Sequence, residues 1–416
     1  MATEQLFVSI IIILVAARIL GEIFQRIRQP PLVGELLAGV IIGPSLLGLV
    51  VSSADLSVLS DLAVFFLMFL AGLEMDPREI RRAGESAIVI SVIAFFVPLV
   101  AGTSVSLLFG LALVQSLFMG LLLSITAVPV SAIVLMQFGV LNTKLGSTVI
   151  TAAVVNDILS LIMLSIILQI TAGNDQLDLA SLVISGIKIV AFLGGIFLFD
   201  VLFRKTQGWL PSRIEPLFRK LQTKEAAFGI LFITTIAISL IAQNIGLHFV
   251  IGTFFSGLIV YKEMIGRQNF SRIYDTISAI TFGFFAPIFF ALIGIEFNVQ
   301  SLVSAIPLLI ALLGVAIMTK IAAGYAGAKL VGFSNDISLA IGFLMNGRGM
   351  VELVIATIGF SVGIIDITLF SLAVAIGLVT SILAPITSRP LVSNAKLRGS
   401  DTVAVQPRNE WKEGAI

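Results

Sequence analysis

The stretch GSTVITAAVVNDILSLIMLSIIL, residues 146–168, is apolar along most of its length and carries the pair Asn156-Asp157 near its middle. It is long enough to cross a lipid bilayer as a helix, which takes about 20 residues. A carboxylate at the bilayer midplane costs on the order of 3 kcal/mol on insertion scales, so it is rarely retained without a function. We therefore interpret Asp157 as a candidate proton or cation site inside a membrane-spanning helix.

The whole chain has the composition of a polytopic membrane protein. Of its 416 residues, 58% are hydrophobic and 12% are charged, and the mean hydropathy is +1.11. A soluble chain of this length carries about twice as much charge. Transmembrane β-strands alternate apolar and polar residues, and the apolar runs here do not, so the spans are predicted to be helices. The net charge of +1 does not indicate nucleic-acid binding, and the absence of cysteine excludes disulfides and thiol chemistry.

Hydropathy predicts thirteen membrane-spanning helices. Their approximate bounds are 6–25, 31–50, 60–75, 87–109, 113–137, 147–170, 181–203, 225–244, 247–262, 276–296, 302–330, 337–361 and 366–386. All but four of the 25 Lys and Arg residues fall after odd-numbered spans, either at the span end, in the loop or in the C-terminal tail. The four exceptions lie inside spans: Arg18, Lys188, Lys320 and Arg348. By the positive-inside rule, this partition predicts an external N-terminus and a cytoplasmic C-terminus.

Two of the predicted spans contain residues that interrupt a helix. Span 113–137 includes Pro129, which cannot donate a backbone hydrogen bond and whose ring clashes with the preceding turn. Span 337–361 includes residues 346–349, Asn-Gly-Arg-Gly, where two glycines flank an arginine. Each is the fifth span of a group of six, and one connecting span separates the groups. The pattern predicts an inverted repeat of six-helix units with two crossing broken helices, which is typical of a transporter binding site.

In these stretches the chain resembles the monovalent cation/proton antiporters, in particular their prokaryotic NapA-like and Kef-like branch. The matching stretches follow the family order: PLVGELLAGVIIGPS (31–45), FLAGLEMD (69–76), TAVPVS (126–131), TAAVVND (151–157), Lys320 and NGRGMVEL (346–353). The resemblance implies an all-α, thirteen-helix NapA/NhaA-like fold, a homodimer, and a core domain that moves like an elevator against a dimerisation scaffold. The implied division is scaffold 1–86 and 225–301, core 87–180 and 302–387, connector helix and cytoplasmic linker 181–224, and polar cytoplasmic tail 388–416.

The resemblance and the residue chemistry together predict the site. Asp157 is expected to bind a dehydrated cation when ionised and to release it when protonated. Asn156, Thr126 and Ser131 are candidate oxygen ligands, the donor class that hard cations prefer. Lys320 is expected to pair with Asp157 when the cation is absent. Four residues are expected to shape the helix crossing and the ion pathway: Arg348, Glu352, Asn346 and Pro129.

The predicted function is secondary-active sodium/proton antiport in a prokaryotic plasma (inner) membrane, with a role in pH homeostasis. Family members with Asn-Asp at this position are linked to one-for-one exchange, so electroneutral exchange is expected. One alternative is potassium/proton exchange on the same fold. Another is a sodium-coupled solute symporter, which would need a larger polar cavity. We expect no cofactor beyond the transported Na⁺ (or K⁺) and H⁺, no nucleic acid, no soluble protein partner and no enzymatic activity, because one histidine and no metal-ligand cluster leave little for catalysis.

Overall fold

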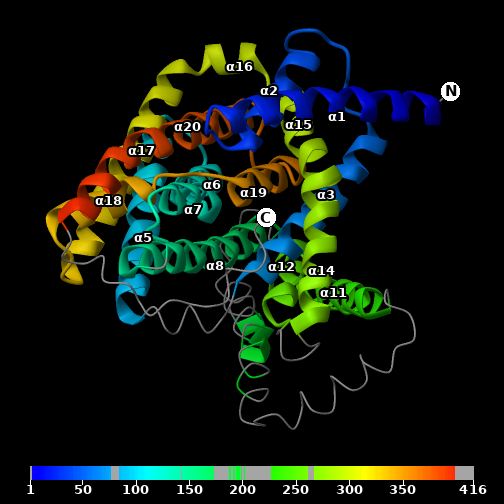
Figure 1. Cartoon of the computed structure of the whole chain (residues 1–416). Helices are drawn as coiled ribbons and strands as arrows, with labels where there is room; N and C mark the ends of the chain where they lie inside the picture. Colours follow the sequence, from blue (N-terminus) through cyan, green and yellow to red (C-terminus); the bar gives the residue numbers. More distant parts are fainter. Residues whose placement is uncertain are drawn as a thin grey trace. The chain divides into compact units, whose positions relative to one another are not determined.

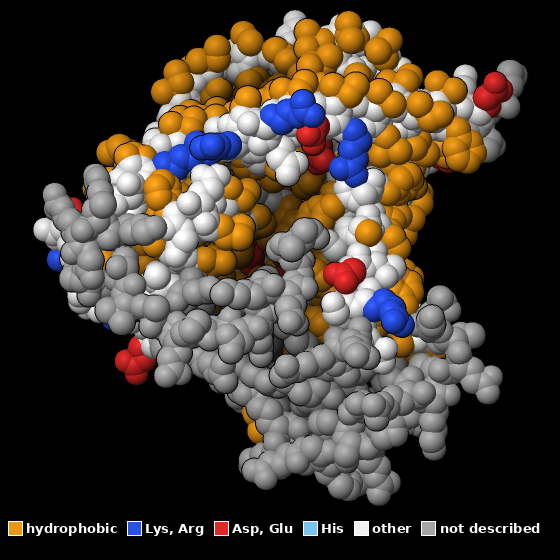
Figure 2. Space-filling view, in the orientation of Figure 1, with side chains coloured by type: hydrophobic (Ala, Val, Ile, Leu, Met, Phe, Trp, Pro, Cys, Tyr) orange, Lys and Arg blue, Asp and Glu red, His pale blue; other side chains and the backbone are white. Residues whose placement is uncertain are grey.

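The computed structural model describes residues 2–75, 84–141, 143–172, 226–260 and 267–398, together with a few positions between 187 and 201. These residues fold into helices and contain no β-strand (Figure 1). Nine helical segments within the described ranges are long and apolar enough to cross a membrane. Hydrophobic side chains dominate the described surface in Figure 2, as expected for helices that face lipid. The chain is therefore an all-helical integral membrane protein.

The chain divides into two compact units. The first comprises residues 1–19, 35–77 and 161–295, and the second comprises residues 20–34, 78–160 and 296–416. Three helices are divided between the units, α1 (Ala2–Arg26), α2 (Pro31–Ile42) and α8 (Lys144–Ala172), and the last residue of α15, Glu296, also falls in the second unit.

The first unit is built around aromatic side chains. Its remaining described helices are α3 (Ala54–Glu74), α11 (Ala226–Asn244), α12 (Phe249–Leu258), α14 (Arg267–Ile280), the π-helix η1 (Thr281–Phe285) and α15 (Ala286–Glu296). Phe66 of α3 stacks on Phe285 of η1 with ring centroids 4.7 Å apart. Helices α3 and α12 approach closely, because a β-carbon at Gly72 would lie 2.1 Å from the Phe254 carbonyl oxygen. Such small-residue contacts are how helices associate in lipid, where burial of apolar surface gives little driving force.

The second unit packs its helices in the same way. They are α5 (Gly84–Leu108), α6 (Leu113–Ser124), α7 (Val128–Gln137), α16 (Val299–Ser304), α17 (Ile306–Leu330), α18 (Asn335–Leu344), α19 (Met350–Ser361) and α20 (Ile367–Arg398). Gly324 of α17 faces α18, where an added β-carbon would lie 2.8 Å from the Gly342 Cα. Gly327, one turn later, meets Ile90 of α5. The small residues of α17 thus allow two neighbouring helices to approach its backbone.

Several helix ends differ from the predicted spans. Helix α2 ends at Ile42, earlier than the predicted end at 50. The predicted span 302–330 begins only at Ile306, because Ala305 separates the short helix α16 from α17. The polar tail was expected to begin at 388, and this was wrong for residues 388–398, which continue α20. Val392 explains this continuation, since it is fully buried in the core of the second unit. The connector 181–224, apart from scattered positions, and the tail beyond Arg398 lie outside the described residues.

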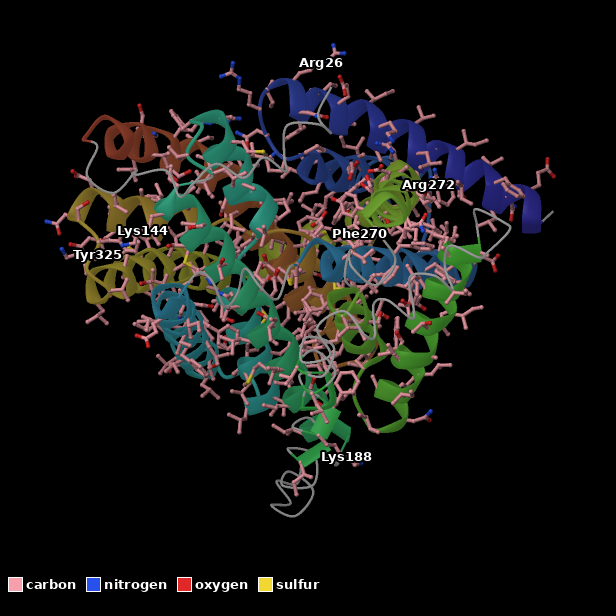
Figure 3. All side chains as sticks on the ribbon, turned by 60° about the horizontal axis from the view of Figure 1, so that its bottom comes forward. Arg26, Lys144, Lys188, Phe270, Arg272 and Tyr325 are labelled. Atoms are coloured by element: carbon pink, nitrogen blue, oxygen red, sulfur yellow. The ribbon has the colours of Figure 1, made fainter. Side chains whose placement is uncertain are left out.

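Charged side chains on the outer helices lie near helix ends. Arg26 is the last residue of α1, and its side chain projects away from the ribbon in Figure 3. Its Nε lies 3.0 Å from Oε1 of Glu22, one turn earlier on the same helix. Both side chains are exposed, and exposed pairs of this kind contribute little to stability. Four of the five buried charged residues in the described ranges, Asp157, Lys320, Arg348 and Glu352, belong to the second unit, and the fifth is Glu35 of α2.

Candidate functional site

The first interruption separates α6 from α7. Residues 125–127 leave the helical conformation, with φ/ψ of −73°/147° at Ile125 and −91°/121° at Ala127. Pro129 then lies in the first turn of α7. A proline is well tolerated there, because its missing N–H would have no intrahelical acceptor in any case. Pro129 therefore begins a new half-helix rather than kinking a continuous one.

The second interruption separates α18 from α19 and lies against the first. The Ala127 backbone N–H donates to the Gly347 carbonyl oxygen at 2.8 Å. The Ser131 hydroxyl donates to the Leu344 carbonyl oxygen at 2.7 Å. A β-carbon at Gly349 would lie only 2.7 Å from the Cβ of Ala127, so the close approach requires glycine. The two broken helices therefore cross in direct contact within one unit.

The end of α6 has a donor for each of its last four carbonyl groups, which no intrahelical N–H can reach. Ser124 Oγ donates to the Leu121 oxygen at 2.7 Å. The Arg348 guanidinium donates to the Leu122 and Leu123 oxygens at 2.5 and 2.8 Å. Lys320 Nζ donates to the Ser124 oxygen, and also to the Ala94 oxygen of α5 at 3.0 Å. Two buried cations thus sit at the negative end of a half-helix dipole, where positive charge is stabilised.

Arg348 also forms a buried ion pair. Its Nη1 lies 2.9 Å from Oε1 of Glu352, one turn later in α19, and both side chains are 1% exposed. Ser381 of α20 donates to the Arg348 carbonyl oxygen at 2.8 Å. Sequence reasoning missed Ser381; the available signal was a hydroxyl within the apolar last span. Arg348 therefore connects the end of α6, helix α19 and helix α20.

Asn156 and Asp157 of α8 lie beside this crossing. Asn156 Nδ2 donates to Thr126 Oγ1 at 3.1 Å, which ties α8 to the first interruption. The side chains of Asn156 and Asp157 are buried. Lys320 donates its hydrogen bonds to backbone oxygens, and its positive charge still acts on Asp157. Oδ1 of Asn156 and Oδ1 of Asp157 have no hydrogen-bond partner among the described residues. The pair thus presents unpartnered oxygens inside the protein.

Five further oxygens of the second unit share this property among the described residues, and two of them belong to residues predicted for the site: Oδ1 of Asn346 and Oε2 of Glu352. Buried polar atoms are nearly always hydrogen-bonded, so a group of unpartnered oxygens needs an explanation. A hard cation prefers carboxylate, amide and hydroxyl oxygens. The arrangement can therefore hold a cation next to an acid that can instead take a proton.

All nine residues predicted for the site belong to the second unit. The contacts connect eight of them: Asn156, Thr126, Ser131, Pro129, Arg348 and Glu352 through hydrogen bonds or their own half-helix, and Asp157 and Lys320 through their charges. Asn346 lies within the second interruption, between Leu344 and Gly347. The Ser131 hydroxyl is committed as a donor to the Leu344 oxygen, and its ligand role stays a prediction.

The fold and the site define a helical membrane transporter whose two interrupted helices meet beside a buried acid. A family model described as "Sodium/hydrogen exchanger, transmembrane" matches residues 10–394. The chain belongs to this family of monovalent cation/proton antiporters.

Individual relatives agree in length with this chain. It is 30% identical over 363 residues to a probable Na⁺/H⁺ antiporter of Bacillus cereus, GerT, covering 86% of this chain and 92% of the relative. It is 30% identical over 381 residues to a Na⁺/H⁺ antiporter of Enterococcus hirae, covering 91% and 96%. A Na⁺/H⁺-K⁺ antiporter of Bacillus cereus, GerN, is 29% identical over 387 residues, covering 92% and 95%. The solved structure of the sodium/proton antiporter MjNhaP1 from Methanocaldococcus jannaschii has the same fold, with a TM-score of 0.71, 16% identity and coverage of 95% and 99%.

Proposed function

We propose that this chain exchanges Na⁺ for H⁺ across the membrane, and that the two ions compete for Asp157. The observation that carries the proposal is the buried Asp157 carboxylate, which has an unpartnered oxygen beside the crossing of two broken helices. An ionised carboxylate attracts a dehydrated Na⁺, and a protonated one has no charge with which to hold it. Competition for a single group couples the two fluxes without any covalent step.

In this proposal the residues around Asp157 have different roles. Asn156 and Thr126, joined by their hydrogen bond, offer an amide oxygen and a hydroxyl oxygen to the cation. Lys320 and Arg348 hold the end of α6 through its carbonyl groups, so their hydrogen bonds leave the Asp157 oxygen available. We assign Ser131 to bracing the crossing through the Leu344 carbonyl group. Lys320 would move to Asp157 only when the cation has left.

The transport cycle we propose is an elevator. Residues 87–180 and 302–387 would move as a core against a scaffold of residues 1–86 and 225–301, which would also form a homodimer interface. Nine long apolar segments and the short apolar helices α2, α12 and the α18–α19 pair are compatible with thirteen spans, the remaining one being predicted at 181–203. The partition of Lys and Arg supports an external N-terminus in a prokaryotic inner membrane.

The decisive experiment reconstitutes the protein in liposomes and follows Na⁺-dependent proton movement with a pH-sensitive dye. Asp157→Asn removes the titrating group while keeping the side-chain shape, and we expect it to abolish exchange. Asp55→Asn, at an exposed acid in the first turn of α3, is the matched control and should exchange like the wild type. Retained exchange in Asp157→Asn would overturn the assignment.

The same vesicles distinguish the alternatives. Potassium/proton exchange is kept as a second candidate, because GerN is named a Na⁺/H⁺-K⁺ antiporter. A dye response to K⁺ that equals the response to Na⁺ would favour it. Asn156, which gives the site one carboxylate rather than two adjacent ones, supports one-for-one exchange. A clear transport current on a solid-supported membrane would contradict this stoichiometry.

A further inference from the structure

The first unit contains a helix that is interrupted by a π-helical segment, η1. Helices α14 and α15 continue into one another through η1, where the Ala286 N–H donates to the Thr281 oxygen five residues earlier. The next residue, Pro287, has no N–H. The carbonyl groups of Phe282 and Gly283, five and four residues before Pro287, therefore lose the donor that a π- or α-helical bond from this position would supply.

A side chain from a distant helix supplies the missing donor. Arg18 of α1 donates from Nη2 to the Phe282 oxygen at 2.5 Å and to the Gly283 oxygen at 2.6 Å. These two carbonyl groups lie five and four residues before Pro287, where the N–H that proline lacks would otherwise bond one of them. Inside a bilayer no water is available to satisfy such groups, so they must find a partner within the protein. Arg18 thus donates to the same two oxygens that lie nearest to the N–H missing at Pro287.

The packing of α2 against α15 brings an acid to the same place. A β-carbon at Gly39 would lie 1.9 Å from the Ala291 oxygen, and one at Gly43 would lie 2.9 Å from the Ile295 Cα. An added β-carbon at Gly294 would lie 2.1 Å from the Leu36 oxygen and 2.9 Å from the Gly39 Cα, so α2 and α15 cross in close contact near Gly39. Glu35 lies one turn before Gly39 in α2. Glu35 is buried, and the charge of Arg18 acts on its carboxylate.

We propose that Arg18, Glu35 and Pro287 form one positioning group that stabilises the π-helical segment η1. Pro287 lacks the N–H that could bond one of two nearby carbonyl groups, Arg18 supplies a donor to both, and Glu35 balances the charge of Arg18 within the apolar surroundings. A cation inside a span is costly unless it is paired or bonded to backbone oxygens, and Arg18 is bonded to two such oxygens. Arg18, Glu35 and Pro287 all lie in the first unit of the fold, and none of them is among the residues around Asp157. Their role does not rest on the proposed exchange activity.

Two other roles for Arg18 would give different results. If Arg18 reached the lipid headgroups, it would contribute to stability through its charge alone, and this contribution would not depend on Pro287. An arginine in the ion path would change the Na⁺ dependence of exchange or its pH profile. The positioning role predicts instead that Arg18 contributes less to stability once Pro287→Ala restores a backbone N–H donor.

The test is a double-mutant cycle on the full chain in detergent, with the thermal melting midpoint as the readout. We expect Arg18→Met to lower the midpoint strongly in the wild-type background. In the Pro287→Ala background, the new N–H can reach Phe282 or Gly283, and we expect the same substitution to cost less than half as much. Equal losses in the two backgrounds would overturn the proposal. Arg272→Met, at an exposed arginine of α14, is the matched control and should cost the same in both.

The experiment still tests the proposal if Arg18→Met alone does not yield folded protein. In that case recovery of folded protein in the double variant supports the proposal, and failure to recover it overturns it. Glu35→Gln should cost more when Arg18 is present than in the Arg18→Met, Pro287→Ala background; additive costs would remove Glu35 from the group. The double variant should exchange with the wild-type Na⁺ half-saturation and pH profile. A shift in either would place Arg18 in the ion path and contradict the positioning role.

Discussion

The crossing in the second unit and the π-helical segment in the first unit pose the same backbone problem. Both leave carbonyl groups without intrahelical donors, and in both a cation from a distant helix supplies them: Arg348 and Lys320 at the end of α6, and Arg18 at η1. The difference lies in what remains. At η1 the Thr281 hydroxyl is a buried side-chain oxygen without a partner among the described residues, whereas at the crossing such oxygens belong to Asp157, Asn156, Asn346 and Glu352.

This difference indicates what makes a broken helix an ion site. At η1 Arg18 caps the carbonyl groups of Phe282 and Gly283, and we interpret this segment as a structural feature. The crossing adds two acids and two amides, each with one oxygen that no donor among the described residues occupies, and these are the groups that a cation can use. In the proposed mechanism, capping by Arg348 and Lys320 satisfies the backbone carbonyl groups and leaves an oxygen of Asp157 without a donor.

The largest loss of stability is expected on replacing Arg348, which donates to two carbonyl groups at the end of α6. Arg348→Met leaves Glu352 as an unpaired buried charge and two α6 carbonyl groups without donors. Losing one partner of a buried ion pair costs about 3–5 kcal/mol. We expect little folded protein, measured by detergent size-exclusion chromatography. The double variant Arg348→Met, Glu352→Met should recover part of the yield, and no recovery would show that the carbonyl caps matter more than the pair.

Replacing Lys320 should have a smaller effect on stability and a clear one on transport. Lys320→Met removes the donor for the Ser124 and Ala94 carbonyl groups. Hydrogen bonds from a charged group contribute about 1.5–3 kcal/mol. The melting midpoint should fall, and the exchange rate should drop or its pH dependence should shift, because Lys320 also acts on the charge of Asp157. An unchanged pH profile with a lowered midpoint would confine Lys320 to capping α6, as Arg18 is confined to η1.

The smallest effect is expected at Ser131. Ser131→Ala removes the hydrogen bond to the Leu344 carbonyl group, a net loss of about 1 kcal/mol. Because the hydroxyl braces the crossing in our assignment, the Na⁺ half-saturation of exchange should stay close to the wild-type value. Thr126→Ala, which removes a group bonded to Asn156, should weaken Na⁺ binding more. The reverse order would make Ser131 a cation ligand and Thr126 a spacer.

The broken helices were predictable because their causes are local. Pro129 and the glycines around Arg348 are visible in the sequence, and the chain breaks immediately beside them. The burial of Asp157 was predictable because a lone acid in an apolar span is conspicuous, while its role as the ion site stays a prediction. Sequence could not assign the partners of Lys320, since its acceptors on α5 and α6 lie 226 and 196 residues away.

The role of Arg18 escaped prediction for the same reason. The sequence placed it inside a span without a partner, and its acceptors lie 264 and 265 residues further along the chain. Pro287, in the middle of the predicted span 276–296, was the available signal that carbonyl groups there need an external donor. The end of α20 was also missed, because polarity suggested a tail where burial of Val392 maintains a helix.

Proton release on Na⁺ binding tests the central claim most directly. NaCl is added to detergent-solubilised protein in weakly buffered solution, with choline chloride as the control salt, and the released protons are counted from mildly acidic to alkaline pH. If both ions compete for Asp157, Na⁺ binding releases protons at pH values where that carboxyl is protonated, and Asp157→Asn releases none. Sodium binding without proton release, or equal release from Asp157→Asn, would contradict the account.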